Sequence, residues 1–188
     1  LNTIGAIHQF TNKKIEDCKD NFDISGIKNL VSVMIGGPNQ HYQFSNKIII
    51  NLINKIKLLK KKFDNFSFYV IVSRRTNNNI LKLLVEQLKE IAYVWDKQSK
   101  NPYLFALKHS KYFVITSDST SMISECSFTG KPIYVYHLPF KRKSRRISNF
   151  HKKFEEKRLT RKLEDNLEIW KYKPLNEAER IAGVLRLR

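Results

Sequence analysis

The sequence has few of the residues that mark secreted, membrane-spanning or zinc-binding proteins. Only Cys18 and Cys126 occur among 188 residues. Two cysteines are too few for a disulfide framework, so we expect a reducing compartment, the cytoplasm. No apolar run reaches the length of a membrane span. The five histidines are scattered, with no pair at ligand spacing and no cysteine pair beside them, which argues against a zinc site.

Several nucleotide-binding and catalytic motifs are also missing. The chain contains no P-loop, no G-x-G-x-x-G and no G-x-S-x-G. The first residues, Leu1–Ile4, do not have the pattern of a signal peptide, and no initiator Met precedes them. We therefore expect this sequence to be a piece of a longer protein.

Acidic residues are scarce relative to basic ones. Lys and Arg number 35 against 17 Asp and Glu, so the net charge is +18. Lys141–Lys162 alone holds eleven Lys and Arg against two Glu, a net charge of +9. Such a block favours an anionic partner (nucleotide phosphates, an acidic protein or an anionic membrane), although a solvated basic face explains it equally well. The aromatic residues nearby are Phe140, Phe150 and Phe154, and their spacing does not suit stacking on successive bases. Nucleic acid is therefore the less favoured partner.

The central feature is a strand–helix–strand pattern over Tyr112–Tyr136. An apolar run, Tyr112–Thr116, precedes the polar turn Ser117–Ser121, a helical pattern, and a second apolar run, Ile133–Tyr136. The connection is too long for a hairpin, so we expect parallel strands with a right-handed crossover. Ligands of such sheets bind beyond the carboxyl ends of the strands, which is where Ser117–Ser121 is placed.

The chemistry of this turn suits an anion. A helix that begins near Ser119 or Thr120 has unpaired N–H groups and a positive dipole end, and the adjacent hydroxyls add further donors. Glu125, about one and a half turns further on, is within reach of a sugar hydroxyl of the same ligand. We assign Asp118 and Glu125 to hydroxyl or amide binding rather than to acid–base catalysis. The alternative is that Ser119 or Ser121 only caps the helix and Glu125 is exposed.

The remaining elements predict an α/β fold. Apolar runs indicate strands at Leu30–Ile35, Phe66–Val72 and Tyr93–Trp95. Apolar residues at helical spacing indicate helices after Ser45, at Ile80–Ile91 and at Tyr103–His109, the last capped by Asn101. This alternation predicts a Rossmann-like parallel sheet with helices on both faces.

Two more polar loops follow predicted strands. Gly36 and Gly37 allow backbone to approach a ligand closely, although tight turns use glycine too. The guanidinium groups of Arg74 and Arg75 are planar forks of N–H donors that can bind two phosphate oxygens at once. An equally good interpretation is that the two arginines are an ordinary surface pair without a ligand. Because three such loops fall at carboxyl ends of strands, we predict a ligand site there and leave catalytic residues unassigned. The predicted phosphate- or nucleotide-binding residues are Gly36, Gly37, Asn39, Ser73, Arg74, Arg75, Thr76, Asn101, Ser117, Asp118, Ser119, Ser121 and Glu125.

The two ends of the chain are less regular. Residues 1–29 are expected to be a connector, with a short helix at Ile15–Phe22, and residues 30–188 to form the domain. Beyond Tyr136 the strand pattern stops. Helices are expected at Ser148–Lys157 and after Asn176.

A set of short motifs resembles one known family. The motifs, in order, are Ile35-Gly36-Gly37-Pro38-Asn39, Ser73-Arg74-Arg75-Thr76, Asn101-Pro102-Tyr103, Thr116-Ser117-Asp118-Ser119-Thr120-Ser121-Met122, Thr129-Gly130-Lys131-Pro132 and Trp170-Lys171-Tyr172-Lys173-Pro174-Leu175-Asn176. Together they resemble the mitochondrial fission "elongated mitochondria" family from about Leu30 to the end. Gly5–His8 resembles the segment that joins the family's two halves, which implies that an N-terminal domain of the same chain is missing.

More broadly, Asn101–Leu138 is similar to the C-terminal domain of GT-B glycosyltransferases. In that fold a small-polar loop and a helix-borne Glu hold the diphosphate and ribose of a nucleotide sugar. The resemblance implies phosphate contacts from Ser117, Ser119 and Ser121, a ribose contact from Glu125, a diphosphate contact from Gly36-Gly37, and charge neutralisation by Arg74 and Arg75. The GT-B base usually comes from the other half, so the isolated domain is expected to be inactive.

Two functions of different classes follow. The first is a nucleotide-sugar-binding domain, with a UDP-sugar as ligand, from a glycosyltransferase or a non-catalytic relative. The rival is a scaffold that docks an acidic protein or an anionic membrane through Lys141–Lys162. Nucleotide titration distinguishes them, because only the first function needs Ser119, Glu125 and Arg75.

Overall fold

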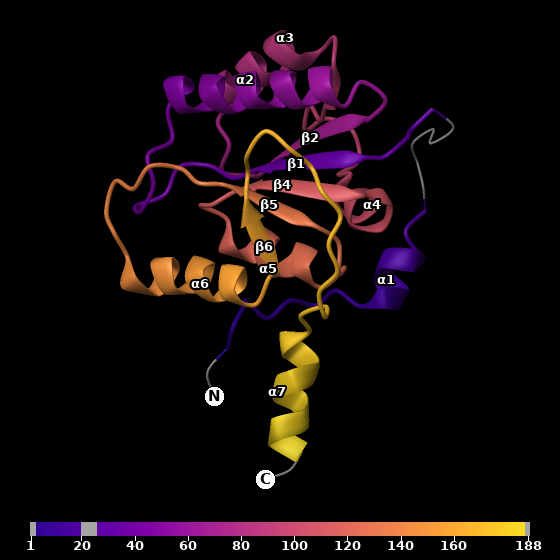
Figure 1. Ribbon diagram of the computed structural model, residues 1–188, viewed down its shortest axis with the longest axis vertical. Coiled ribbons are helices and arrows are strands. Elements are labelled where there is room, and N and C mark those ends of the chain that lie inside the picture. The colour runs from indigo at the N-terminus through magenta and orange to yellow at the C-terminus, as the bar shows by residue number, and fades with distance from the viewer. Residues whose placement is uncertain (1–2, 20–25, 187–188) are drawn as a thin grey trace.

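One parallel sheet of six strands forms the centre of the protein (Figure 1). The computed structural model describes residues 3–19 and 26–186. The strands are β1 (Val31–Ile35), β2 (Phe68–Val72), β3 (Ala92–Val94), β4 (Tyr112–Thr116), β5 (Ile133–Tyr136) and β6 (Thr160–Lys162). Their spatial order is β3-β2-β1-β4-β5-β6, and each neighbouring pair is parallel. This is the doubly wound Rossmann order, so the predicted fold class is confirmed.

Helices cover both faces of this sheet (Figure 1). α2 (Asn46–Lys62) and α3 (Asn78–Leu88) lie on one face, and α4 (Tyr103–His109), α5 (Thr120–Ser127) and α6 (Arg145–Glu156) lie on the other. The short α1 (Asn12–Glu16) and the projecting α7 (Glu177–Arg186) stand near the chain ends. No helix in the described ranges is both long and apolar enough to span a bilayer.

The central strands are apolar throughout because both of their faces are covered. Every residue of β1, β2 and β4 is buried. Strands enclosed in this way read as continuous hydrophobic runs rather than as alternating patterns. The runs that predicted these strands from the sequence are therefore the direct signature of their burial.

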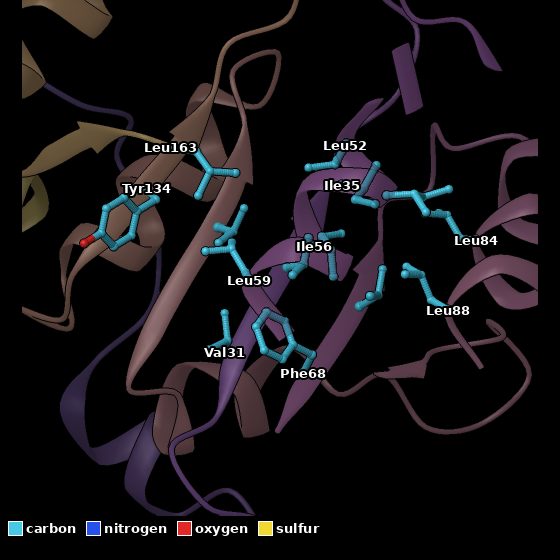
Figure 2. Packing of buried hydrophobic residues seen from close by; sticks show 14 of the residues in the cluster. Val31, Ile35, Leu52, Ile56, Leu59, Phe68, Leu84, Leu88, Tyr134 and Leu163 are labelled. Atoms are coloured by element: carbon cyan, nitrogen blue, oxygen red, sulfur yellow. The ribbon is translucent and has the colours of Figure 1, made fainter. Parts of the chain in front are cut away.

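α2 supplies most of the cover on its face. Its apolar positions recur every three or four residues, so they form one stripe that faces the sheet. In Figure 2, Leu52, Ile56 and Leu59 lie against Val31, Ile35 and Phe68. Beyond α2, Leu163, Leu167 and Trp170 continue the cover over β5 from the segment that follows β6.

The helix predicted at Ile15–Phe22 is wrong in its bounds. α1 begins at Asn12 because the Thr11 hydroxyl accepts a hydrogen bond from the Lys14 N–H (3.1 Å). It ends at Glu16. Residues 20–22 of the predicted helix lie outside the described part of the chain.

Two expectations beyond Tyr136 are also wrong. β6 continues the sheet after the predicted end of the strand pattern, with Thr160 paired to Ile133. Its three residues include two charged side chains, so no apolar run marks it, and its strand conformation comes from pairing with the edge of β5. α6 begins at Arg145, three residues before the predicted start, because the Ser144 side chain accepts from Ile147 N.

The first described part of the expected connector, residues 3–10, packs against the helices that follow it in the chain. Residues 3–10 run beneath α5 and α6 in Figure 1. The Ala6 N–H donates to Ser124 Oγ (2.9 Å), and the Ile4 N–H donates to Glu177 Oε2 (3.0 Å). The segment therefore joins α5 to the start of α7.

A buried carboxylate joins the loops at the carboxyl edge of the sheet. Asp118, whose side chain has no exposed area, accepts from Gly37 N (2.9 Å), Arg75 Nη2 (2.9 Å) and Thr116 Oγ1 (2.6 Å). These partners follow or end β1, β2 and β4. A Cβ on Gly36 would lie 2.0 Å from the carboxylate, so only glycine allows this approach.

A buried histidine attaches α6 to the same edge. His151 Nε2 lies 3.0 Å from the Ser117 carbonyl oxygen and 3.1 Å from the Tyr42 hydroxyl. Burial, together with the neighbouring His137, lowers the pKa of His151 from 6.5 to about 4, and the hydrogen bond with the Ser117 carbonyl opposes this shift. The ring is therefore neutral at pH 7, and His137 itself meets Glu155 Oε1 at 3.3 Å.

Replacing the buried carboxylate tests how strongly it holds the loops. We expect Asp118→Asn to lower the free energy of unfolding by about 2 kcal/mol, because a charge-assisted hydrogen-bond acceptor is lost in a buried place. Urea denaturation measures this difference. Asp165→Asn is the matched control, because Asp165 pairs with Lys55 but is 73% exposed, and it should change stability little. Equal effects of the two substitutions would contradict the role given to Asp118.

The lowered pKa of His151 predicts a pH dependence of stability. Between about pH 6.5 and 4 the unfolded chain binds a proton at this position that the folded chain does not, so stability falls as the pH falls through that window. The full loss from this group is about 3 kcal/mol. Urea denaturation from pH 7.5 to 4 should show a smaller slope for His151→Gln than for the parent chain. An identical slope in both proteins would show that another group causes the dependence.

Candidate functional site

The three polar loops of the sequence prediction meet where the strand order changes direction. From β1 the sheet continues to β2 on one side and to β4 on the other. In sheets of this kind, ligands bind beyond the carboxyl ends of the strands at such a point. Asp118 contacts all three loops, and the Asn39 side-chain amide adds a bond to its carbonyl oxygen (3.4 Å).

Several predicted site residues use their polar groups inside the protein. Ser117 has no exposed area, and its hydroxyl accepts from Leu138 N (2.9 Å). Thr76, 2% exposed, donates through Oγ1 to the Gly36 carbonyl oxygen. Asn39 Oδ1 accepts from His41 N (2.8 Å) and Tyr42 N (2.9 Å). These side chains hold the loops in shape.

The two adjacent arginines differ in their surroundings. The Arg75 guanidinium contacts Asp118 and donates to the Gly37 carbonyl oxygen (2.8 Å). A Cβ on Gly37 would lie 2.5 Å from the Arg75 backbone, so the close approach expected of a ligand is made here by the protein itself. Arg74 is exposed and forms no ion pair with any residue in the described ranges. Ser73 Oγ accepts from Arg75 N (3.2 Å) and shapes this turn.

The start of α5 has an open donor array. Ser119 occupies the cap position but makes no side-chain capping bond. The residue is only 8% exposed, and its hydroxyl makes no hydrogen bond within the described part of the chain. Ser121, in the first turn, is exposed. The first-turn N–H groups and the positive end of the helix dipole are thus available to an anion.

Glu125 lies further along α5 and contacts α4. Its carboxylate accepts a hydrogen bond from the Tyr103 hydroxyl. Burial raises the pKa of Glu125, and the bond from Tyr103 opposes that rise. Asn101 positions this partner, because its Oδ1 accepts from Tyr103 N (3.0 Å). The cap position of α4 is Pro102, so the prediction that Asn101 caps this helix is wrong by one residue. Sequence reasoning missed Tyr103, although its place directly after Asn101-Pro102 was a usable signal.

A cavity of about 370 Å³ adjoins the α5 terminus. Thr120 of α5, Arg146 and Lys153 of α6 and the segment Thr3–Ala6 lie in its wall. The sequence placed both cations in a basic segment but not in the site. Their spacing of seven residues, which puts them on one helix face, was the available signal. A separate apolar cavity of about 780 Å³ lies at the amino ends of β2 and β3, away from this edge.

The site offers hydrogen-bond donors for an anion rather than ligands for a metal ion. In residues 3–19 and 26–186, no three His, Cys, Asp or Glu side chains gather closely enough to hold a metal ion. Its groups are helix N–H groups, hydroxyls, Arg74 and one carboxylate. Such a set binds phosphate and hydroxyl groups.

Similar proteins are found both by sequence and by structure. The mitochondrial fission protein ELM1 of Arabidopsis thaliana is 31% identical over 196 residues, which cover 98% of this chain and 44% of that protein. An uncharacterised protein of Rickettsia prowazekii is 31% identical over 170 residues, which cover 85% and 47%. The chain thus spans less than half the length of these relatives.

A solved structure with a related arrangement is the UDP-GlcNAc 2-epimerase from Neisseria meningitidis, bound to UDP-GlcNAc. The TM-score is 0.47 and the identity 18%, over 86% of this chain and 37% of that one. A similarity of this size is too low to transfer a function. The family model for mitochondrial fission ELM1, in contrast, matches residues 1–188. The resemblance seen in the motifs is therefore confirmed, and the chain belongs to the mitochondrial fission ELM1 family.

Proposed function

We propose that this chain binds a nucleotide sugar, a UDP-sugar first of all, with a phosphate at the N-terminus of α5. It would form the C-terminal half of a GT-B-like glycosyltransferase or of a relative that binds without catalysis. The observation that carries the proposal is the open start of α5 at the switch point of the sheet, with the Ser119 hydroxyl unpaired. Phosphate at a helix N-terminus is stabilised by N–H groups and by the dipole together.

The proposed site has an outer layer that meets the ligand. Ser119 and Ser121 donate to phosphate oxygens beside the first turn of α5. Arg74, exposed and without an ion pair in the described chain, neutralises phosphate charge. Glu125, held by Tyr103, accepts from a ribose hydroxyl.

An inner layer supports these groups. Asp118 fixes the loops, Arg75 compensates its charge, and Gly36 and Gly37 make room for both. Because these contacts are internal, we propose that they orient the ligand-binding groups rather than touch the ligand. The chain supplies no assigned catalytic base, so activity would need the other half of the protein.

Calorimetric titration with UDP, GDP, CMP and their sugar conjugates tests the proposal. We expect saturable binding of one nucleotide, weakened about tenfold by Glu125→Gln and by Arg74→Ala, since each removes a charge-assisted contact. Arg75→Ala should act differently, because it unpairs the buried Asp118 and lowers the melting temperature. Lys82→Ala, at an exposed position of α3, is the control for net charge.

A separate observation supports the rival function, that of a scaffold. The loop before α6 and the solvent side of that helix expose a row of cations, Lys141, Arg142, Lys143, Arg145, Arg146, Lys152 and Lys153. Such a face suits an acidic protein or an anionic membrane surface. A folded chain that binds none of the nucleotides, yet sediments with anionic vesicles, would overturn the nucleotide proposal in favour of a scaffold.

A further inference from the structure

The strand β3 forms one edge of the sheet, and its outer side has no partner. It is the first strand in the spatial order and pairs only with β2. In a parallel pair, alternate residues bond to the same neighbour, and the Trp95 N–H donates to the Val70 carbonyl oxygen (2.9 Å). Tyr93 therefore bonds to β2 as well, whereas the N–H and C=O groups of Ala92 and Val94 point away from it. These groups form no hydrogen bond with any residue in the described part of the chain.

The two edges of the sheet differ in their side chains. Natural edge strands commonly carry charged residues, because an open edge pairs readily with a strand of another chain. At the opposite edge, β6 exposes Arg161 and Lys162. The residues of β3 are Ala92, Tyr93 and Val94, none of them charged. β3 is therefore the edge that is open to another strand.

The apolar cavity of about 780 Å³ at the amino ends of β2 and β3 adjoins this open edge. Phe66, Val85, Ile91 and Tyr93 lie in its wall. The Val85 side chain is 38% exposed and that of Tyr93 47%, so part of this apolar wall meets water. Exposed apolar surface beside a strand with unpaired backbone groups is typical of an interaction site.

The same edge carries no net charge, although the whole chain is strongly basic. Lys89 and Glu90 precede β3, and Asp96 and Lys97 follow it. Each end of the strand thus has one cation and one acid, whereas the chain has a net charge of +18. Two copies of so basic a chain repel one another, so they approach most easily through a surface whose charges cancel. Antiparallel pairing brings the two ends of the strand together, so that a cation of one copy can lie beside an acid of the other.

We propose that a second copy of this chain binds along β3 in antiparallel orientation, about a two-fold axis that passes through the contact between the two Tyr93 residues. In this register, Ala92 of each copy pairs with Val94 of the other, so the outward N–H and C=O groups of both residues gain partners. The two Tyr93 side chains face each other as a cross-strand aromatic pair. Trp95 of each copy lies opposite Ile91 of the other, at the wall of the apolar cavity. The sheet is then continuous across both copies.

A charge exchange at the two-fold axis tests the inference. Analytical ultracentrifugation measures the molar mass of the purified chain from micromolar to millimolar concentration, and the parent chain should approach twice the monomer mass. Tyr93→Lys and Tyr93→Glu should each weaken association at least about tenfold, because like charges then face each other. An equimolar mixture of the two variants should recover association to within about threefold of the parent chain, because each Lys then faces a Glu.

Two controls and a backbone variant separate this geometry from other causes. Ile169→Lys adds the same charge at another exposed apolar position, 64% exposed and in the segment after β6, and should leave association unchanged. Both Tyr93 variants lose the ring contact with Tyr69 (centroids 4.5 Å apart), so a shared loss of stability cannot explain recovery in the mixture. Val94→Pro removes an outward N–H without removing a bond to β2, and it should also weaken association.

Three results would overturn the inference. A parent chain that stays monomeric up to millimolar concentration would show that the β3 edge does not pair. Dimers that persist in both single Tyr93 variants would place the interface elsewhere. Folded single variants that are monomeric and do not associate when mixed would exclude a two-fold axis at Tyr93. None of these measurements needs a nucleotide, so the proposed function stands or fails separately.

Discussion

The buried carboxylate of Asp118 is the interaction on which the carboxyl edge depends. A charge removed from water is costly unless hydrogen bonds and an opposite charge replace the lost hydration. Gly37, Thr116 and Arg75 provide that replacement from the ends of three strands. The loops must therefore converge on one point, and the start of α5 is positioned by the same turn.

This constraint divides residues of one chemical kind between two roles. Both arginines are exposed, but Arg75 is paired with Asp118, whereas Arg74 forms no ion pair in the described ranges. Of the serines in the turn, Ser117 is enclosed and bonded to Leu138 N, whereas Ser119 keeps an unpaired hydroxyl. Some side chains of the polar loops that predicted a site therefore only hold the loops in shape. The proposed ligand-binding groups are the fewer side chains that make no such internal contact.

The C-terminal part shows where local patterns fail. The strands β4 and β5 match their predicted bounds because apolar side chains enclosed on both faces leave a continuous run. β6 has no such run, since it pairs with β5 on one side only and two of its three side chains are exposed. Likewise, Arg145 and Arg146 in the first turn of α6 oppose the helix dipole, so the local pattern does not predict a helix that starts after the Ser144 cap.

The amino-acid sequence by itself determined the α/β class, the position of the central strands and the family, because burial and helical packing impose periodicities that can be read locally. It also placed three polar loops at one edge. Only the tertiary structure decided which of their side chains turn inward, because the deciding bonds join residues far apart in the chain, such as Gly37 with Asp118 and Arg75 with Asp118. It likewise placed Arg146 and Lys153 beside Thr120, since helix packing, rather than sequence spacing, brings α6 to the start of α5.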